Sequence, residues 1–295
     1  MQYRILGKTN LSVSAIGIET HQWSGRGGLF FSEEEVGEML SRAEELCINF
    51  IDTGECYLYH AAERLIGSAL VKKRHKFIIA TKFGHTVREG EVVGGWEGDI
   101  IEKELDASLK ALRTDYIDVY QAHINAPGDG QSFLSHAGEI RDVLEAALGA
   151  GKIRFVGICL GDNVLMDEDG KILSGALAAL PLATVQTVYN RINAEAEKNI
   201  IPVAMKENLG IIARIPLAKG YLSSRFRPPE DYDEKRLAVV EKIKQEEMPQ
   251  GVDLAEWAIG WCLRREEIAT VVPGCSATAH LDSSVKALEY IKPSR

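Results

Sequence analysis

Segments typical of β-strands and of α-helices alternate along almost the whole chain, and this alternation constrains the fold more than any single motif. The early strand-like stretches are rich in Ile, Val and Phe and lack a strict polar–apolar alternation, as strands covered on both faces do. The predicted strands are 15–18, 49–52, 77–82, 116–123, 154–159, 183–189, 210–215 and 268–273. A helical pattern follows each strand, which predicts a parallel α/β fold.

The helical patterns complete eight strand–helix units. They lie at 32–46, 61–70, 100–112, 139–150, 174–180, 195–208, 253–264 and 278–290. Ser32, with Glu35 three residues later, forms a capping box at the start of the first helix. Eight such units fit an α/β (β/α)₈ TIM barrel of about 250 residues. An open doubly wound sheet would usually carry a GxGxxG turn after its first strand, and residues 17–20 do not match it. We therefore predict one barrel domain over residues 1–295.

Three segments lie outside the repeat. Residues 4–9 and 11–14, joined by Asn10, read as a short β-hairpin before the first strand. Residues 221–250 are expected as a helical insertion after the seventh strand, and a glycine-rich stretch ending at Trp96 as a flexible loop after the third. In a barrel, the last two project over the carboxyl ends of the strands, where ligands bind.

Charge and cysteine usage exclude several classes of protein. A net charge of −9 and a pI near 5.4 argue against a nucleic-acid-binding surface. No apolar run approaches the roughly 20 residues that cross a bilayer, and the opening residues lack the pattern of a signal peptide. The five cysteines are widely spaced and odd in number, which is not a disulfide framework. We expect a soluble, cytoplasmic protein, and the sequence does not indicate its oligomeric state.

Polar residues end three successive predicted strands. Asp52, Lys82 and His123 hold these positions, and Tyr57 follows the first of them in a loop. Carboxyl ends of parallel strands meet at one face, so these side chains are expected to converge there. A nearby ammonium group stabilises a phenolate, a carboxylate keeps that ammonium charged, and a histidine can donate a hydrogen bond to a carbonyl oxygen. Such a set can protonate a polarised C=O, but it needs a nicotinamide cofactor as hydride source.

The order of several short motifs completes this picture. They include Tyr-Arg-Ile-Leu-Gly at 3–7, Asn-Phe-Ile-Asp-Thr at 49–53, Glu-Arg-Leu-Ile-Gly at 63–67, Ile-Ala-Thr-Lys at 79–82, Asp-Tyr-Ile-Asp at 115–118, Gly-Lys-Ile-Arg at 151–154 and Val-Pro-Gly at 272–274. Over about residues 3–285 the chain resembles the aldo-keto reductases, as a short bacterial- or archaeal-type member. The resemblance implies a (β/α)₈ barrel whose N-terminal hairpin closes the bottom.

The resemblance also implies catalytic roles. Tyr57 becomes the general acid that protonates the carbonyl oxygen of an aldehyde or ketone. Lys82 lowers the pKa of Tyr57, Asp52 pairs with Lys82, and His123 orients the carbonyl. The partner so implied is a small-molecule carbonyl substrate.

Cofactor binding is implied at a second group of positions, some of which depart from the family pattern. Cys159 and Leu160 replace the usual Ser-Asn, and Ser283 and Ser284 replace Glu-Asn. NADP(H) is favoured by the resemblance and NAD(H) stays open, since His280 is the only basic candidate after the eighth strand. The chain also ends soon after its last predicted helix, so the family's C-terminal loop is expected to be short or absent. The cofactor-binding residues implied are Thr20, Cys159, Gln186, Arg214, Leu217, Lys219, Gly274, Cys275 and His280.

The sequence allows two alternatives to the reductase to be compared with it. The altered cofactor positions leave open a nucleotide-binding regulatory protein with little or no turnover. A metal-dependent hydrolase is disfavoured, because His21, His60 and His85, taken with Glu19 or Asp52, show no metal-ligand spacing. We therefore predict no metal site, and we expect Cys56 and Cys159 to be inert buried thiols, although the sequence does not decide whether either is redox-active.

Overall fold

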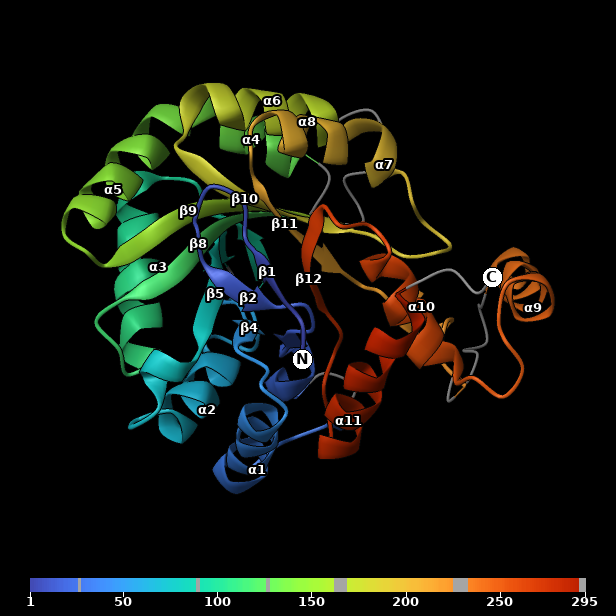
Figure 1. Ribbon diagram of the computed structural model, residues 1–295. Helices are drawn as coiled ribbons and strands as arrows, with labels where there is room; N and C mark the ends of the chain where they lie inside the picture. The colour runs from blue at the N-terminus through green and yellow to red at the C-terminus, as the bar shows by residue number, and fades with distance from the viewer. Residues whose placement is uncertain (26–27, 89–90, 126–127, 162–168, 225–232, 292–295) are drawn as a thin grey trace.

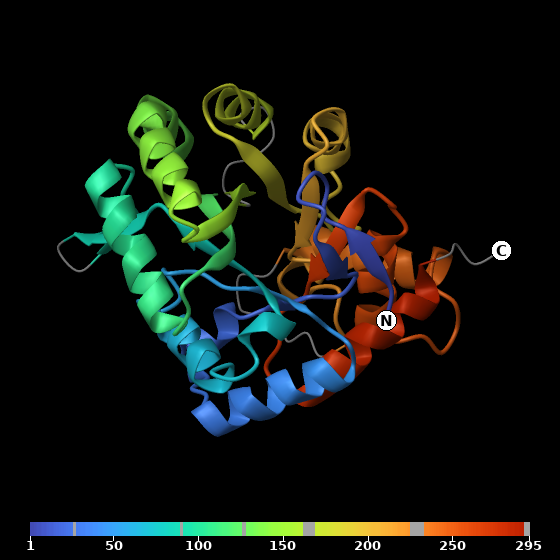
Figure 2. The same ribbon diagram turned by 60° about the vertical axis from the view of Figure 1, so that its left-hand side comes forward.

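The fold is a barrel of parallel strands inside a ring of helices, with a small hairpin at one end (Figures 1 and 2). The computed structural model describes residues 1–25, 28–88, 91–125, 128–161, 169–224 and 233–291. Eight strands form one sheet in the order β12-β11-β10-β9-β8-β5-β4-β3. They are β3 (Ile18–Glu19), β4 (Phe50–Asp52), β5 (Ile78–Phe83), β8 (Ile117–Ile124), β9 (Ile153–Leu160), β10 (Leu182–Val188), β11 (Gly210–Arg214) and β12 (Ile268–Val272).

Backbone contacts between the first and last strand regions nearly close the barrel. Parallel bridges join Ile16 to Val271 and Glu19 to Gly274. The predicted (β/α)₈ fold is therefore confirmed. The first strand was expected at 15–18, but its regular part is only β3, while Ala15 and Gly17 exchange hydrogen bonds with the backbone of Val271.

The helices that follow the strands agree with the predicted pattern within a few residues. They are α1 (Glu33–Glu45), α2 (Ala61–Ala69), α3 (Gly98–Ala111), α5 (Ala137–Gly149), α6 (Asp169–Ala179), α7 (Ala196–Asn199), α8 (Ile201–Lys206), α10 (Leu254–Leu263) and α11 (Thr278–Lys286). The capping box of Ser32 and Glu35 is present. The single helix expected at 195–208 is divided into α7 and α8, because Pro202 has no N–H to continue the hydrogen-bond pattern.

The N-terminal hairpin covers the amino ends of the strands. Strands β1 (Tyr3–Ile5) and β2 (Ser12–Ser14) pair antiparallel, as predicted, and Gly7 bridges Leu209 just before β11. Gly7 has φ +50°, and a Cβ there would lie 2.2 Å from the backbone nitrogen of Gly210. Leu6, Leu11 and Val13 of the hairpin belong to one apolar cluster with barrel residues. This end of the barrel is therefore packed, and the opposite end is left for function.

Additional elements lie at the carboxyl end of the barrel. The stretch after β5 was expected as a flexible loop, but it contains an antiparallel hairpin of β6 (His85–Arg88) and β7 (Glu91–Gly94). The expectation was therefore wrong for the described part of this stretch. Gly90 lies outside the described residues. A short helix, α4 (Asp129–Ser135), was not predicted. The insertion contains α9 (Glu234–Glu246), which packs on α10, while residues 225–232 of it lie outside the described residues. No helix in the described part of the chain is long and apolar enough to span a bilayer.

Candidate active site

Four predicted catalytic residues lie at the carboxyl ends of neighbouring strands. Asp52 ends β4, Lys82 lies on β5, His123 lies on β8, and Tyr57 belongs to the loop after β4. The Lys82 Nζ donates hydrogen bonds to Asp52 Oδ2 at 2.7 Å, to Tyr57 OH at 3.0 Å and to the Thr53 carbonyl oxygen at 2.5 Å. All four side chains are buried. A single ammonium group thus joins the carboxylate to the phenol.

Lys82 is held as a cation. Burial by itself would lower the pKa of Lys82, but the attraction and the hydrogen bond of Asp52, together with Cys159, outweigh it, and the pKa lies above its ordinary value. The Nζ also lies 4.8 Å from the centroid of the Tyr57 ring, within the range of a cation–π contact. The loop residue Tyr57 is therefore fixed to the barrel by a fully buried charged side chain.

The pKa of Tyr57 moves in the direction opposite to the one expected from Lys82 alone. Burial raises the pKa of the phenol well above its usual value, and the negative charges of Glu19 and Asp52 add to that effect. The expectation that Lys82 lowers the pKa of Tyr57 did not include burial and Glu19, which set the net direction. The consequence is that Tyr57 carries its proton at neutral pH.

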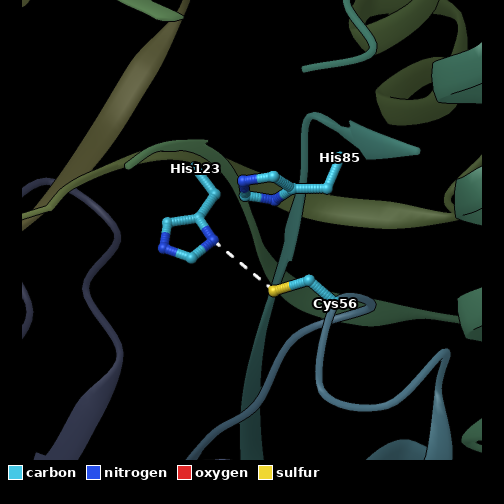
Figure 3. Close-up of side chains that lie close together, drawn as sticks. All are labelled: Cys56, His85 and His123. Atoms are coloured by element: carbon cyan, nitrogen blue, oxygen red, sulfur yellow. Dashed lines mark hydrogen bonds between the residues drawn. The ribbon is translucent and has the colours of Figure 1, made fainter. Parts of the chain in front are cut away.

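His123 is brought beside the other three residues but binds different partners. Its Nδ1 lies 3.8 Å from the Cys56 Sγ, and its ring meets His85 edge-on at 4.8 Å between centroids (Figure 3). Among the described residues, its buried Nε2 has no hydrogen-bond partner. Burial, reinforced by His85 and by two nearby cations, lowers the pKa of His123 well below its usual value, so the ring is neutral.

Hydrogen bonds connect Asp52 to the predicted cofactor residues. Gln186 Nε2 donates to Asp52 Oδ1 at 2.7 Å, and Gln186 Oε1 accepts from the Cys159 thiol at 3.0 Å. Arg214 Nη1 in turn lies 3.5 Å from the Cys159 Sγ. Both ends of the Gln186 amide are therefore engaged by protein groups, and Arg214, Cys159 and Gln186 form a continuous path to the catalytic set.

The loop that carries Tyr57 is held by a buried cluster of charges. Leu58, Tyr59 and His60 all have positive φ, which is uncommon for residues other than glycine. His60 Nδ1 lies 2.5 Å from Glu63 Oε2 and its Nε2 lies 3.1 Å from Glu104 Oε2. Burial alone would lower the pKa of His60, but these two carboxylates raise it to about 9. The strained loop is thus tied to α2 and α3 by a charged histidine.

The loop after β11 is distinguished by its backbone conformation. Ile215, Ala218 and Lys219 have φ of +55°, +48° and +59°, and Leu217 lies between them. A β-branched residue with positive φ is an outlier that persists where the surroundings enforce it, and such strain is concentrated at functional sites. This loop continues from Arg214, so it borders the same pocket.

The remaining predicted cofactor residues lie at the junction of the first and last strands. Thr20 Oγ1 donates to the Asp52 carbonyl oxygen, and Gly274 bridges Glu19. The Cys275 carbonyl oxygen accepts a hydrogen bond from the indole N–H of Trp23. The Cys275 thiol donates to the Ala277 carbonyl oxygen. His280, in the first turn of α11, holds Ser276 through Nδ1. Cys275 and His280 therefore contact residues next to the last strand and α11, whereas Thr20 contacts the backbone of Asp52.

Sequence reasoning missed several residues of this pocket. Glu19 was considered only as a possible metal ligand, yet its partly buried carboxylate lies near Asp52, and burial followed by that neighbour raises its pKa. The ring of His21 lies 4.7 Å from the Tyr57 ring. Cys56 and His85 meet at His123 from separate elements, and the sequence holds no signal for this because no fixed spacing links them.

Two surface hollows of the described structure lie elsewhere. One, of about 670 Å³, is lined by residues such as His75, Lys110 and Thr114 that precede β5 and β8, at the amino ends of the strands. The other, of about 650 Å³, lies between α8 and α10. The convergent polar side chains and the shifted pKa values are at the carboxyl ends of the strands, which is where barrel enzymes act.

A barrel with buried acid–base groups at the carboxyl ends of its strands defines the class of (β/α)₈ enzymes. The sequence profile of the Aldo/keto reductase family matches residues 15–294, so the chain belongs to this family of oxidoreductases. It is 27% identical over 281 residues to the aldo-keto reductase yakc [NADP(+)] of Schizosaccharomyces pombe, covering 88% of this chain and 79% of that protein. It is also 27% identical to L-galactose dehydrogenase of Arabidopsis thaliana, covering 99% and 89%.

Solved structures agree with this assignment. The holo form of aldo-keto reductase AKR11C1 from Bacillus halodurans superposes with a TM-score of 0.84 at 26% identity, covering 100% of this chain and 93% of that one. The apo form of the same protein gives a TM-score of 0.76 at 25% identity, covering 100% and 92%. The architecture of this chain is therefore more similar to the holo form than to the apo form.

Proposed function

We propose that this protein reduces an aldehyde or ketone to the alcohol, with hydride from NAD(P)H and with Tyr57 as the proton donor. The observation that carries the proposal is the position of the Lys82 Nζ, which hydrogen-bonds both the Asp52 carboxylate and the Tyr57 hydroxyl inside the barrel. This arrangement supports acid catalysis because it places a protonated phenol next to a fixed positive charge.

Proton delivery is assigned to Tyr57 with help from its neighbours. Its raised pKa keeps the hydroxyl protonated until a carbonyl oxygen gains negative charge. The Lys82 cation then stabilises the phenolate that remains after the proton has moved. Asp52 keeps Lys82 charged, and Gln186 and Gln121 hold the other carboxylate oxygen of Asp52. In the reverse direction the same phenolate acts as the base.

His123 is assigned to orient the carbonyl. The ring is neutral, because burial lowers its pKa, and so carries one proton. If that proton is on the unpartnered Nε2, then Nε2–H is a donor for the carbonyl oxygen, and Nδ1 accepts from the Cys56 thiol. A donor aimed at the oxygen polarises the C=O before hydride arrives.

The site fits a nicotinamide nucleotide at the strained loop 215–219 and at the partly buried guanidinium of Arg214. When bound, this cofactor supplies the hydride that the side chains lack. Arg214 would stack on the nicotinamide, and residues 217–219 would follow the pyrophosphate, which accounts for the positive φ of Lys219. Thr20, Cys159 and Gln186 would border the nicotinamide, and Gly274, Cys275 and His280 would border the adenosine end. NADP(H) is favoured, with NAD(H) as the alternative, since a relative carries NADP(+) in its name.

A nucleotide-binding protein with little turnover is the second candidate. It is favoured by one feature of the cofactor side: the buried, apolar Leu160 offers no hydrogen bond to a carboxamide, and the Gln186 amide is already engaged at both ends. These features weaken the grip on a nicotinamide without touching the proton donor. The two candidates therefore differ in turnover and not in fold.

One experiment separates the two candidates. NADPH and NADH are titrated while tryptophan fluorescence is followed, with Trp23 as the expected reporter because its indole hydrogen-bonds the Cys275 carbonyl oxygen. Oxidation of the preferred nucleotide is then measured with a panel of aldehydes, ketones and quinones. The reductase predicts saturable binding and turnover that falls by about 10²- to 10⁴-fold in Tyr57→Phe, the usual contribution of a general acid.

Other outcomes have definite meanings. Tight nucleotide binding without turnover, and without any effect of Tyr57→Phe, would refute the reductase and favour the regulatory protein. Failure to bind either nucleotide would refute both.

A further inference from the structure

Next to the acid–base set, three side chains converge that no part of the proposed reaction requires as a group. The thiol of Cys56 and the imidazoles of His85 and His123 offer one ligand atom each, and these atoms all lie within 4.8 Å of one another (Figure 3). They come from the loop after β4, from the start of β6 and from β8. Residues so far apart in the chain meet only because the barrel brings these elements together.

We propose that Cys56, His85 and His123 form a binding site for Zn²⁺ beside the carbonyl-binding position. A thiolate with two neutral imidazoles is a borderline-soft donor set that suits Zn²⁺, with water in the fourth position. The prediction from sequence was that no metal site exists, because it considered regular spacing and a different set of histidines. That prediction did not consider this cluster, because its members share a place in space and not a motif.

One of the three distances between the ligand atoms is close to that of a tetrahedral zinc site, and the other two are at most 4.8 Å. Zn–S near 2.3 Å and Zn–N near 2.0–2.1 Å require a sulfur–nitrogen separation of about 3.5 Å. The Cys56 Sγ lies 3.8 Å from the His123 Nδ1, so this edge needs to shorten by only a few tenths of an ångström. Cys56 is partly exposed, which gives an ion a route to the site from the pocket.

The surroundings complete the site in two ways. His85 Nδ1 lies 3.2 Å from the Oε1 of the buried Glu55, which is the carboxylate–histidine arrangement that orients a zinc ligand and leaves Nε2 to bind. The Cys56 thiolate and the Glu55 carboxylate would also offset the two charges of Zn²⁺, next to the Lys82 and Arg214 cations.

The consequence for the proposed reaction, on which this step rests, concerns His123. When Nδ1 binds the metal, the one ring proton must reside on Nε2, the nitrogen assigned to the carbonyl oxygen. Without metal, the Cys56 thiol does the same more weakly by donating to Nδ1. Zinc would thus lock His123 as an Nε2–H donor.

Cobalt(II) tests the site on the full chain without nucleotide or substrate. We expect a thiolate-to-cobalt absorption band in the near ultraviolet and visible bands of four-coordinate Co²⁺, both removed by equimolar Zn²⁺. Cys56→Ser should abolish the near-ultraviolet band, whereas Cys47→Ser, at an exposed thiol, should keep it. Glu55→Gln should weaken affinity by about tenfold or more, as loss of an outer partner does. His85→Gln should weaken it further, and His75→Gln is its exposed control.

The outcomes are decisive for the site whether or not the protein turns over a carbonyl. A near-ultraviolet band that survives Cys56→Ser, or that disappears in Cys47→Ser, would overturn the proposal. So would equal affinity in His85→Gln and His75→Gln, both checked for folding by circular dichroism. In the zinc-bound protein, ¹⁵N NMR should show His123 protonated at Nε2, and protonation at Nδ1 would refute the tautomer lock.

Discussion

The proton-transfer side and the nucleotide side of this pocket are built by different means. On the proton side, Lys82, Asp52 and Tyr57 are joined by short hydrogen bonds between buried side chains. On the nucleotide side, the loop at 215–219 depends on backbone in the left-handed region, and Leu160 contributes only packing. Side-chain networks of buried charge fail when one member is removed, whereas backbone-built sites tolerate changes of side chain. The comparison predicts large effects on the first side and graded effects on the second.

The largest effect is expected from Lys82→Met. Removing the cation leaves the Asp52 carboxylate buried without its partner, which costs about 3–5 kcal/mol of unfolding free energy. Turnover should fall by about 10²-fold or more because the Tyr57 phenolate loses its stabilising charge. Nucleotide affinity should be largely spared. Denaturant unfolding, carbonyl reduction and fluorescence titration measure the three quantities.

A double variant separates folding from chemistry. Lys82→Met combined with Asp52→Asn removes both charges, so it should recover much of the lost stability while turnover stays low. Near-normal turnover in either variant would show that Lys82 is not needed for proton transfer. The proton side would then be no more sensitive to the loss of one side chain than the nucleotide side.

His60 should make the stability of the proton side depend on pH. Its pKa is about 9 in the folded protein and about 6.5 unfolded, and at 1.36 kcal/mol per unit this corresponds to about 3 kcal/mol. Because the folded pKa is the higher one, this stabilisation is complete below pH 6.5 and is lost as pH rises to about 9. The stability difference between wild type and His60→Gln should therefore be large at pH 6 and small at pH 10, as measured by urea unfolding.

The exposed His75 supplies the control for this pH dependence. His75→Gln should change stability little at either pH. A deficit of His60→Gln that is equal at pH 6 and pH 10 would show that the anchor acts by packing, without a charged histidine.

The fold and half of the site could be read from the sequence for a physical reason. Strand–helix periodicity is local, and side chains that end parallel strands must meet, so Asp52, Lys82 and His123 were predictable. The direction in which the pKa of Tyr57 shifts was not predictable, because it depends on burial and on Glu19 from another strand. The contact of Cys56 with His123 was not either, since it depends on how a loop folds back onto the barrel.

On the nucleotide side, His280→Arg should change cofactor preference. A guanidinium in the first turn of α11 can bind the 2′-phosphate of NADPH through charge-assisted hydrogen bonds worth about 1.5–3 kcal/mol, or about tenfold and more in affinity. NADH affinity should change little. Fluorescence titration with both nucleotides measures the ratio, and His75→Arg at the opposite end of the barrel is the control. An unchanged ratio in a folded variant would place the 2′-phosphate away from α11.

The smallest effect is expected from Cys159→Ser. A hydroxyl at this position, next to Gln186, is a better hydrogen-bond partner for a nicotinamide carboxamide than the thiol is, so nucleotide affinity should rise by about fivefold, the equivalent of one neutral hydrogen bond of about 1 kcal/mol. Cys262→Ser makes the same change at another buried thiol, which faces the Tyr189 carbonyl oxygen, and should leave affinity unchanged. Turnover at saturating nucleotide should be equal in both variants, because within the described structure the Cys159 thiol hydrogen-bonds Gln186 and Arg214 and neither Tyr57 nor Lys82. A drop in saturated turnover for Cys159→Ser alone would mean that the path from Cys159 through Gln186 to Asp52 tunes proton transfer as well, and the two sides of the pocket would then act as one network.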